Sequence, residues 1–168
     1  MKVIDSYSIF STVQASLTEQ EINKLRMFEP SMTIQQDKHY KMAVDTVRDS
    51  LTKINTQPQS SSPYTGKNVK VGILDSGIDT EHRDLNVIDG FCSLAPDCST
   101  GVPYDDNNGH GTHVAGVIAA LANGTGLVGV APNVDLYSIK VLNDLGAGTT
   151  SSIVQGIEWA INHKLDII

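Results

Sequence analysis

Two side chains in this sequence have the types and settings that acid–base chemistry requires. Asp75 ends a short apolar run, residues 69–75, and a Ser-Gly turn follows it. His110 lies between two glycines, at the start of a run of small and apolar residues. A carboxylate that accepts a hydrogen bond from one imidazole nitrogen fixes the tautomer of the ring and stabilises its protonated form. We therefore expect Asp75 and His110 to act as an acid and base pair.

The segments that must position this pair have the pattern of an α/β protein. Short apolar runs are typical of buried parallel strands, and small apolar residues at helical spacing indicate helices packed on a sheet. The sequence predicts strands over residues 69–75, 134–142 and 165–168 and helices over residues 114–120 and 153–161. Thr150 or Ser151 can cap the second helix. The expected fold is a parallel sheet with helices on both faces, preceded by a small α+β segment.

Three motifs carry a resemblance to a known family. They are ILDSGID at residues 73–79, GHGTHVAG at residues 109–116 and GVAP at residues 129–132. In this order they resemble the subtilisin-like serine proteases, whose triad runs Asp, His, Ser along the chain. The resemblance implies an endopeptidase that cleaves polypeptides through an acyl-enzyme. It assigns His110 as the general base and then acid, and Asp75 as the residue that orients it.

The nucleophile of that family lies in a Gly-Thr-Ser-Met-Ala type segment far downstream, and the 168 residues contain none. We therefore expect a fragment of the catalytic domain that is inactive alone, since its base has no hydroxyl to activate. The alternative is a non-catalytic relative that binds or regulates another protease, although both motifs are intact. A metal hydrolase using His110 and His113 is disfavoured because HGTH lacks the Glu and third ligand of a zinc protease. A packed, hydrogen-bonded His113 is the expectation.

Residues 1–42 differ in composition from the rest of the chain. They are charge-balanced, so residues 43–168 carry the whole net charge of -7. Alternation over residues 7–15, a capping box from Thr18 to Glu21 and an edge strand over residues 32–36 resemble the last half of an inhibitor-type propeptide. The resemblance implies a zymogen bound by its own propeptide, with processing within residues 39–43. The alternative is an ordinary helix and strand extension packed on the main domain.

The same resemblance implies two further sites. A structural calcium ion would be held by oxygen atoms, which suit a hard cation; the ligating residues would be Asp84, Leu121, Asn123, Thr125 and Leu127. A Gly-rich turn without metal is the alternative. An extended peptide substrate would pair with a strand of small residues beside an apolar pocket; the residues concerned are Leu142, Gly146, Ala147 and Gly148. A flexible loop is the alternative there.

Composition limits the other classes of partner. There is no basic patch for nucleic acid, and the net charge of -7 argues against an anionic membrane. No apolar run approaches the roughly 18 to 20 residues that cross a bilayer, and no signal peptide begins the sequence. The family resemblance nonetheless implies secretion. Cys92 and Cys98 are the only cysteines; a small disulfide between them is the expectation, and two reduced thiols are the alternative.

Overall fold

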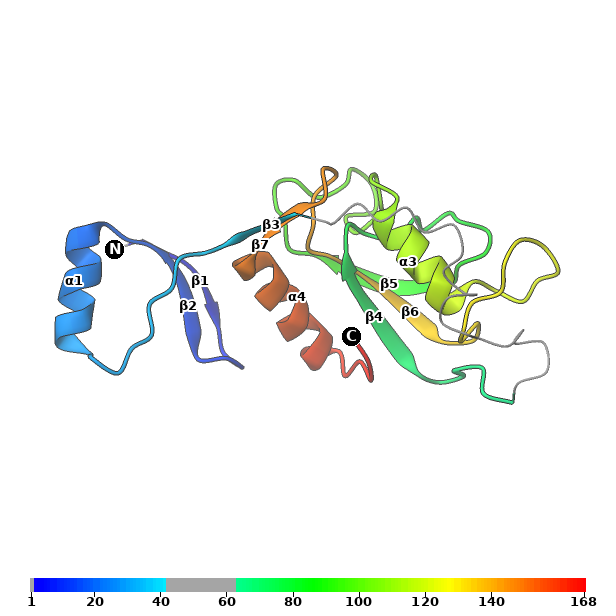
Figure 1. Cartoon of the computed structure of the whole chain (residues 1–168), viewed down its shortest axis with the longest axis horizontal. Coiled ribbons are helices and arrows are strands. Elements are labelled where there is room, and N and C mark those ends of the chain that lie inside the picture. The colour runs from blue at the N-terminus through cyan, green and yellow to red at the C-terminus, as the bar shows by residue number, and fades with distance from the viewer. Residues whose placement is uncertain (1, 42–62) are drawn as a thin grey trace. The chain divides into compact units, whose positions relative to one another are not determined.

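The computed structural model describes residues 2–41 and 63–168. The chain divides into two compact units, Met1–Lys38 and His39–Ile168 (Figure 1). Residues 57–63 are polar and bounded by prolines, which is typical of a loop, and except for Pro63 they lie outside the described residues. None of the described helices has the length and hydrophobicity needed to cross a membrane.

The N-terminal unit consists of a hairpin and one helix. Strands β1 (Lys2–Tyr7) and β2 (Thr12–Ser16) pair antiparallel, and helix α1 (Glu19–Phe28) follows. The capping box is confirmed, because the Thr18 hydroxyl accepts from the Glu21 N–H and the Glu21 carboxylate accepts from the Thr18 N–H. The strand predicted over residues 32–36 is wrong. Those residues have no ladder partner in the described part of the chain, and the next strand, β3, is His39–Lys41.

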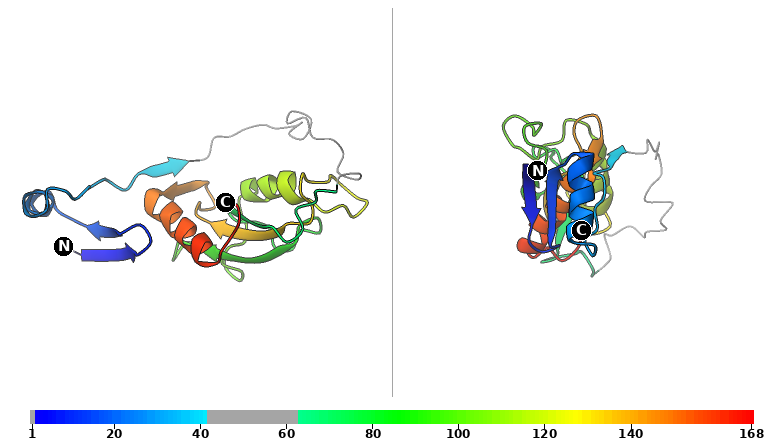
Figure 2. Two further views of the ribbon diagram at one scale, coloured as in Figure 1. Left: turned by 90° about the horizontal axis from the view of Figure 1, so that it is seen from below. Right: turned by 90° about the vertical axis from the view of Figure 1, so that its left-hand side faces the viewer.

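The second unit confirms the predicted α/β class. Its further elements are β4 (Lys70–Asp75), β5 (Val87–Cys92), α3 (His110–Ala119), β6 (Asp135–Lys140), β7 (Ala147–Thr149) and α4 (Thr150–Asn162). Strand β6 is central, with β4 and β5 parallel to it on either side (Figure 2). The strand expected at residues 165–168 is reduced to one parallel bridge, Val71 to Ile167.

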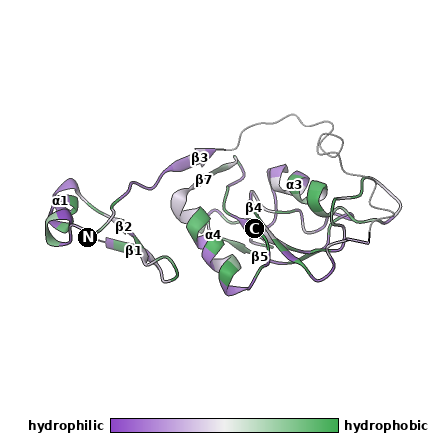
Figure 3. Ribbon diagram, turned by 60° about the horizontal axis from the view of Figure 1, so that its bottom comes forward, coloured by the Kyte–Doolittle hydropathy of each residue, from purple (hydrophilic) through white to green (hydrophobic). Residues whose placement is uncertain are grey.

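Alternation along the strands sends apolar side chains to both faces of this sheet. Val71 and Ile73 belong to a core cluster with Ala115 of α3, whereas Leu74 packs on a second cluster that contains Ala160 of α4. Figure 3 shows hydrophobic residues in both helices. The cap of α4 is Thr149, one residue before the predicted pair, because its hydroxyl accepts from the Ser152 N–H at 3.1 Å.

Candidate active site

The last residue of β4 and the first residue of α3 meet at the carboxyl edge of the parallel sheet, where open α/β sheets bind ligands. The Nδ1 atom of His110 lies 2.7 and 2.8 Å from the two carboxylate oxygens of Asp75. The Asp75 side chain is 11% exposed and the His110 side chain 37%. The carboxylate is therefore shielded from water, while the imidazole keeps its other nitrogen, Nε2, for proton exchange with a reacting group.

Ser76 connects the two elements that carry this pair. Its N–H donates to Asp75 Oδ1 at 2.7 Å, so the carboxylate is held from the strand side. Its hydroxyl accepts from the Gly111 N–H at 3.1 Å and donates to Asp106 Oδ1 at 2.9 Å. Ser76 is fully buried. Ser76 thus fixes the Asp75 carboxylate through its backbone N–H and the first turn of α3 through its hydroxyl.

Asp106 caps helix α3 from outside the helix. The N-cap residue, Gly109, has a left-handed φ of 98° and no side chain to offer. Asp106 Oδ2 instead accepts from the N–H and the hydroxyl of Thr112, at 2.9 and 2.6 Å. Asp106 Oδ1 accepts from the N–H groups of Asn108 and Gly109, both at 3.0 Å. These bonds satisfy donors that a helix start leaves unpaired.

The hydrogen bonds to Asp106 lower the pKa of its carboxyl group. Burial by itself would raise the pKa of the carboxyl group, but hydrogen bonds from the Thr112 side chain and from the backbone N–H groups around it outweigh burial. The pKa therefore lies below its ordinary value of 3.8. Neither Ser76 nor Asp106 was singled out from the sequence. The only signals for them are the Ser after Asp75 and an Asp four residues before the histidine.

A glycine contact sets the spacing between β4 and α3. A Cβ atom on Gly111 would lie 2.0 Å from the Gly77 carbonyl oxygen and 3.1 Å from Asp75 Cβ. Only a residue without a side chain permits this approach, and the approach brings His110 within hydrogen-bond distance of Asp75. The glycine after the histidine is therefore a requirement of the site.

The segment predicted to pair with substrate is a strand of the second unit. Strand β7 pairs antiparallel with β3, with Tyr40 opposite Gly148 and Lys41 opposite Ala147. The turn before β7 is held by Asn143, whose side-chain oxygen accepts from the Ala147 N–H at 3.0 Å. Leu142 is half-buried and packs against the core cluster that contains Val141. The flexible-loop alternative is excluded for β7, since its backbone is paired.

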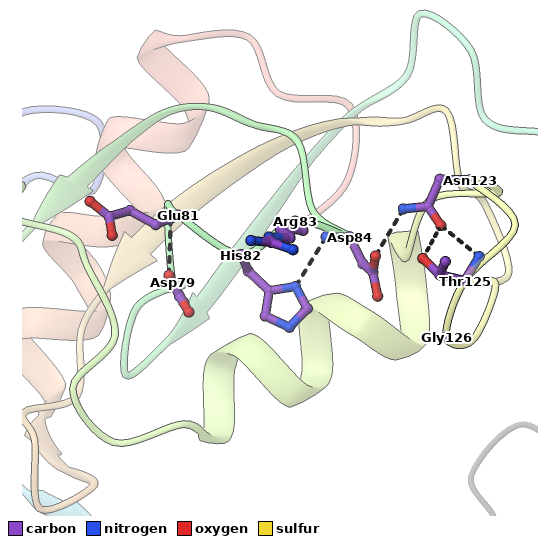
Figure 4. Close-up of a pocket in the computed structure, with 8 residues that line it drawn as sticks. All are labelled: Asp79, Glu81, His82, Arg83, Asp84, Asn123, Thr125 and Gly126. Carbon is purple, nitrogen blue, oxygen red and sulfur yellow. Dashed lines mark hydrogen bonds between the residues drawn. The ribbon is translucent and has the colours of Figure 1, made fainter.

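Three of the five residues predicted to hold calcium, Asp84, Asn123 and Thr125, line one pocket, whereas Leu121 and Leu127 are not among its lining residues (Figure 4). Asp84 Oδ1 accepts from Asn123 Nδ2 at 2.8 Å, and Asn123 Oδ1 accepts from the Thr125 hydroxyl at 2.8 Å. The Leu121 N–H donates to the Asp84 carbonyl at 2.9 Å. A Cβ atom on Gly126 would lie 2.8 Å from Asp84 Oδ2, so the glycine leaves space beside that oxygen. The Asp84 carboxylate and the space beside it are compatible with a hard cation, which prefers oxygen ligands.

Two remaining predictions are settled by side-chain positions. Cys92 and Cys98 form a disulfide, which decides between the two alternatives left open by their spacing. The expectation of a packed, hydrogen-bonded His113 is wrong, because the side chain is exposed on α3. Its exposure means that the sheet does not bury it. No three His, Cys, Asp or Glu side chains form a metal-binding group within residues 2–41 and 63–168.

The Asp75–His110 pair thus lies at the carboxyl edge of the parallel sheet. Residues 66–168 match the family described as the subtilase family. Subtilisin E of Bacillus subtilis is 42% identical over 168 residues, which are 99% of this chain and 43% of the relative. Subtilisin DY of Bacillus licheniformis is 52% identical over 124 residues, 73% of this chain and 43% of the relative.

A thermostable alkaline protease of Halalkalibacterium halodurans is 40% identical over 166 residues, 99% of this chain and 44% of the relative. The chain belongs to the subtilase family. It spans about 43% of the length of the subtilisins it matches.

Proposed function

We propose that this chain supplies the acid–base part of a serine endopeptidase. The observation that carries the proposal is the contact of His110 Nδ1 with the Asp75 carboxylate at 2.7 Å, in a chain of the subtilase family. Nε2 of His110 would take the proton of a serine hydroxyl as that oxygen attacks the peptide carbonyl, and later deliver it to the leaving amine. Asp75 would stabilise the imidazolium between these steps.

The 168 residues contain no Gly-Thr-Ser-Met-Ala type segment. They therefore supply the base and its orienting carboxylate without the hydroxyl that the base would activate. We propose that these residues alone do not hydrolyse peptides. Turnover then requires the serine and the oxyanion-hole donors of the family.

The proposed substrate is an extended polypeptide that pairs with β7. Small residues at Ala147 and Gly148 leave the strand edge open to an incoming backbone. The antiparallel pairing of β3 with β7 supports this mode, since a segment of the same chain already uses that edge. It also supports the proposal that residues 1–42 form the end of a propeptide, with processing within residues 39–43. In such a zymogen the propeptide end blocks the strand that substrate needs.

Calcium binding and secretion belong to the same proposal. Calcium would be held by the Asp84 carboxylate, the Asn123 amide oxygen and the backbone carbonyls of Leu121, Thr125 and Leu127. The ion would tie the loop before β6 to the segment after β4, which is a structural role. The bond between Cys92 and Cys98 supports a secreted protein, because disulfides persist in oxidising compartments.

The test is peptide hydrolysis by the complete product of the source gene. We expect His110→Ala to lower kcat by about a million-fold, as loss of the triad histidine does in a subtilisin. His113→Ala is the matched control, because it removes an exposed imidazole from the same helix and should keep full activity. Equal activity of the two variants would contradict the proposal. A folded complete product with no turnover would favour a binding or regulatory relative instead.

A further inference from the structure

A lysine lies buried beside the acid–base pair and takes no part in the chemistry described above. Lys140 is the last residue of the central strand β6, in register with Asp75 on one side and Cys92 on the other. Its exposure is 0%, and it is the largest fully buried side chain of the described residues. A buried ammonium group is unfavourable unless acceptors surround it. Its acceptors therefore indicate what the lysine holds in place.

One acceptor leads to the carboxylate of the pair. Lys140 Nζ donates to the backbone carbonyl of Ser76. The N–H of the same residue donates to Asp75 Oδ1 at 2.7 Å, and its hydroxyl accepts from the Gly111 N–H. Fixing the Ser76 carbonyl limits rotation of this residue. The ammonium group thus restrains the donor that orients the Asp75 carboxylate.

The other acceptor leads to the histidine. Lys140 Nζ donates to Asp144 Oδ1 at 2.9 Å, and the Asp144 side chain is 51% exposed. The Asp144 backbone carbonyl accepts from Asn108 Nδ2 at 2.8 Å. Asn108 Oδ1 in turn accepts from the His110 N–H at 3.2 Å. Asp144 also precedes β7 by three residues, so the same ion pair anchors the turn before the proposed peptide-binding strand.

We propose that Lys140, with Asp144 as its counter-ion, is a positioning residue for the Asp75–His110 pair. It joins the end of β4, the segment before α3 and the turn before β7 through one buried charge. The role rests on the proposed function, because a positioned base matters only if the base is used. Replacing a buried charge together with its counter-ion by apolar side chains often leaves stability unchanged, and here the buried charge is Lys140. Positioning and stability can therefore be separated in one variant.

The decisive variant is Lys140→Met/Asp144→Leu in the 168-residue chain. The matched control is Lys70→Met/Asp135→Leu, which makes the same residue exchanges at the first residues of β4 and β6. Lys70 and Asp135 are register partners there, far from the ends of these strands that carry Asp75 and Lys140. The readout is the strongly deshielded proton NMR signal of His110 Nδ1–H, which reports its hydrogen bond to Asp75. Urea denaturation of each variant reports stability. Neither readout requires peptide hydrolysis, so failure of the proposed function would not be mistaken for failure of the positioning role.

We expect the Lys140→Met/Asp144→Leu variant to keep its urea midpoint but to lose the Nδ1–H signal or shift it upfield. The control variant should keep both. The single variant Asp144→Asn, at a half-exposed position, should shift the signal in the same direction, and it decides the matter if the double variant does not fold. An unchanged Nδ1–H signal in the folded variants would overturn the proposal.

Discussion

Replacing Asp106 by Asn tests whether this carboxylate holds the histidine helix against β4. Asp106 accepts five hydrogen bonds, three on Oδ1 and two on Oδ2. An amide keeps one accepting oxygen and places an NH2 group where the other stood. At least the two bonds from Thr112 are therefore lost. Loss of a helix cap costs about 1 kcal/mol, and a neutral hydrogen bond is worth about 1 kcal/mol.

The lost negative charge adds to this loss, because Asp106 lies at the positive end of α3. A charge at a helix terminus contributes about 0.3–1 kcal/mol when it is partly exposed and screened by solvent. Asp106→Asn should therefore lower the free energy of unfolding by about 2.5 kcal/mol at neutral pH, the sum of the three terms. Urea denaturation of the 168-residue chain measures this value.

Asp105→Asn is the matched control for this substitution. Asp105 accepts two bonds from Thr80, at 2.9 and 3.2 Å, and both end on the same oxygen. An amide can keep that oxygen in place, so the expected loss is under about 1 kcal/mol. Equal losses in the two variants would refute the capping role of Asp106.

The pH dependence gives a second check on the same residue. The folded-state pKa of Asp106 lies below the ordinary value of 3.8, so between these two values the unfolded chain binds more protons than the folded chain. The stabilisation by the carboxylate is complete above the ordinary pKa and is lost as pH falls through the folded one. The difference between wild type and Asp106→Asn should therefore shrink on acidification in this window. A difference that does not change with pH would contradict the assignment.

Three further predictions concern other parts of the second unit. Calcium at about 100 times its Kd should raise the free energy of unfolding by about 3 kcal/mol, and Asp84→Asn should remove this effect. The measurement is thermal melting at increasing calcium concentrations. Equal stabilisation of wild type and Asp84→Asn would exclude the site. Gly111→Ala should destabilise by about 3 kcal/mol through overpacking, because its Cβ would lie 2.0 Å from the Gly77 carbonyl; an unchanged urea midpoint would contradict the close contact. Joint replacement of Cys92 and Cys98 by Ser should cost about 2 kcal/mol, the entropy of closing so short a loop, and thiol titration of the unfolded wild type should find no free thiol.

Strands β4 and β6 and helices α3 and α4 were predictable because their signals are local, whereas β5 was not predicted. The apolar runs over residues 69–75 and 134–142 indicate buried strands and identify β4 and β6. The histidine helix follows from small residues that fit against a sheet. Its first residue and the end of β4 also gave the two members of the acid–base pair. These features depend on the residue types of one segment at a time.

The features that the sequence did not predict depend on contacts between segments. The residue types allow three N-caps for α4: Thr149, Thr150 or Ser151. The N-cap is Thr149, because its backbone is extended and the helix begins at the next residue. Residues 32–36 have the pattern of a strand, but a strand also needs a pairing partner. In this part of the chain the paired strand is β3, whose partner is β7. Lys140 is a charged residue inside the run over residues 134–142. Its role follows from acceptors 64 residues upstream and four residues downstream, which spacing alone does not reveal.

The most direct test of the central claim is labelling with diisopropyl fluorophosphate, which modifies a serine only when a base activates it. The reagent is applied in parallel to the 168-residue chain and to the complete product of the source gene, and the modified residue is mapped by peptide mass spectrometry. The account predicts one adduct in the complete product, on a serine outside these 168 residues, and its loss in His110→Ala. An adduct on a serine within the 168 residues, or undiminished labelling of His110→Ala, would contradict the account.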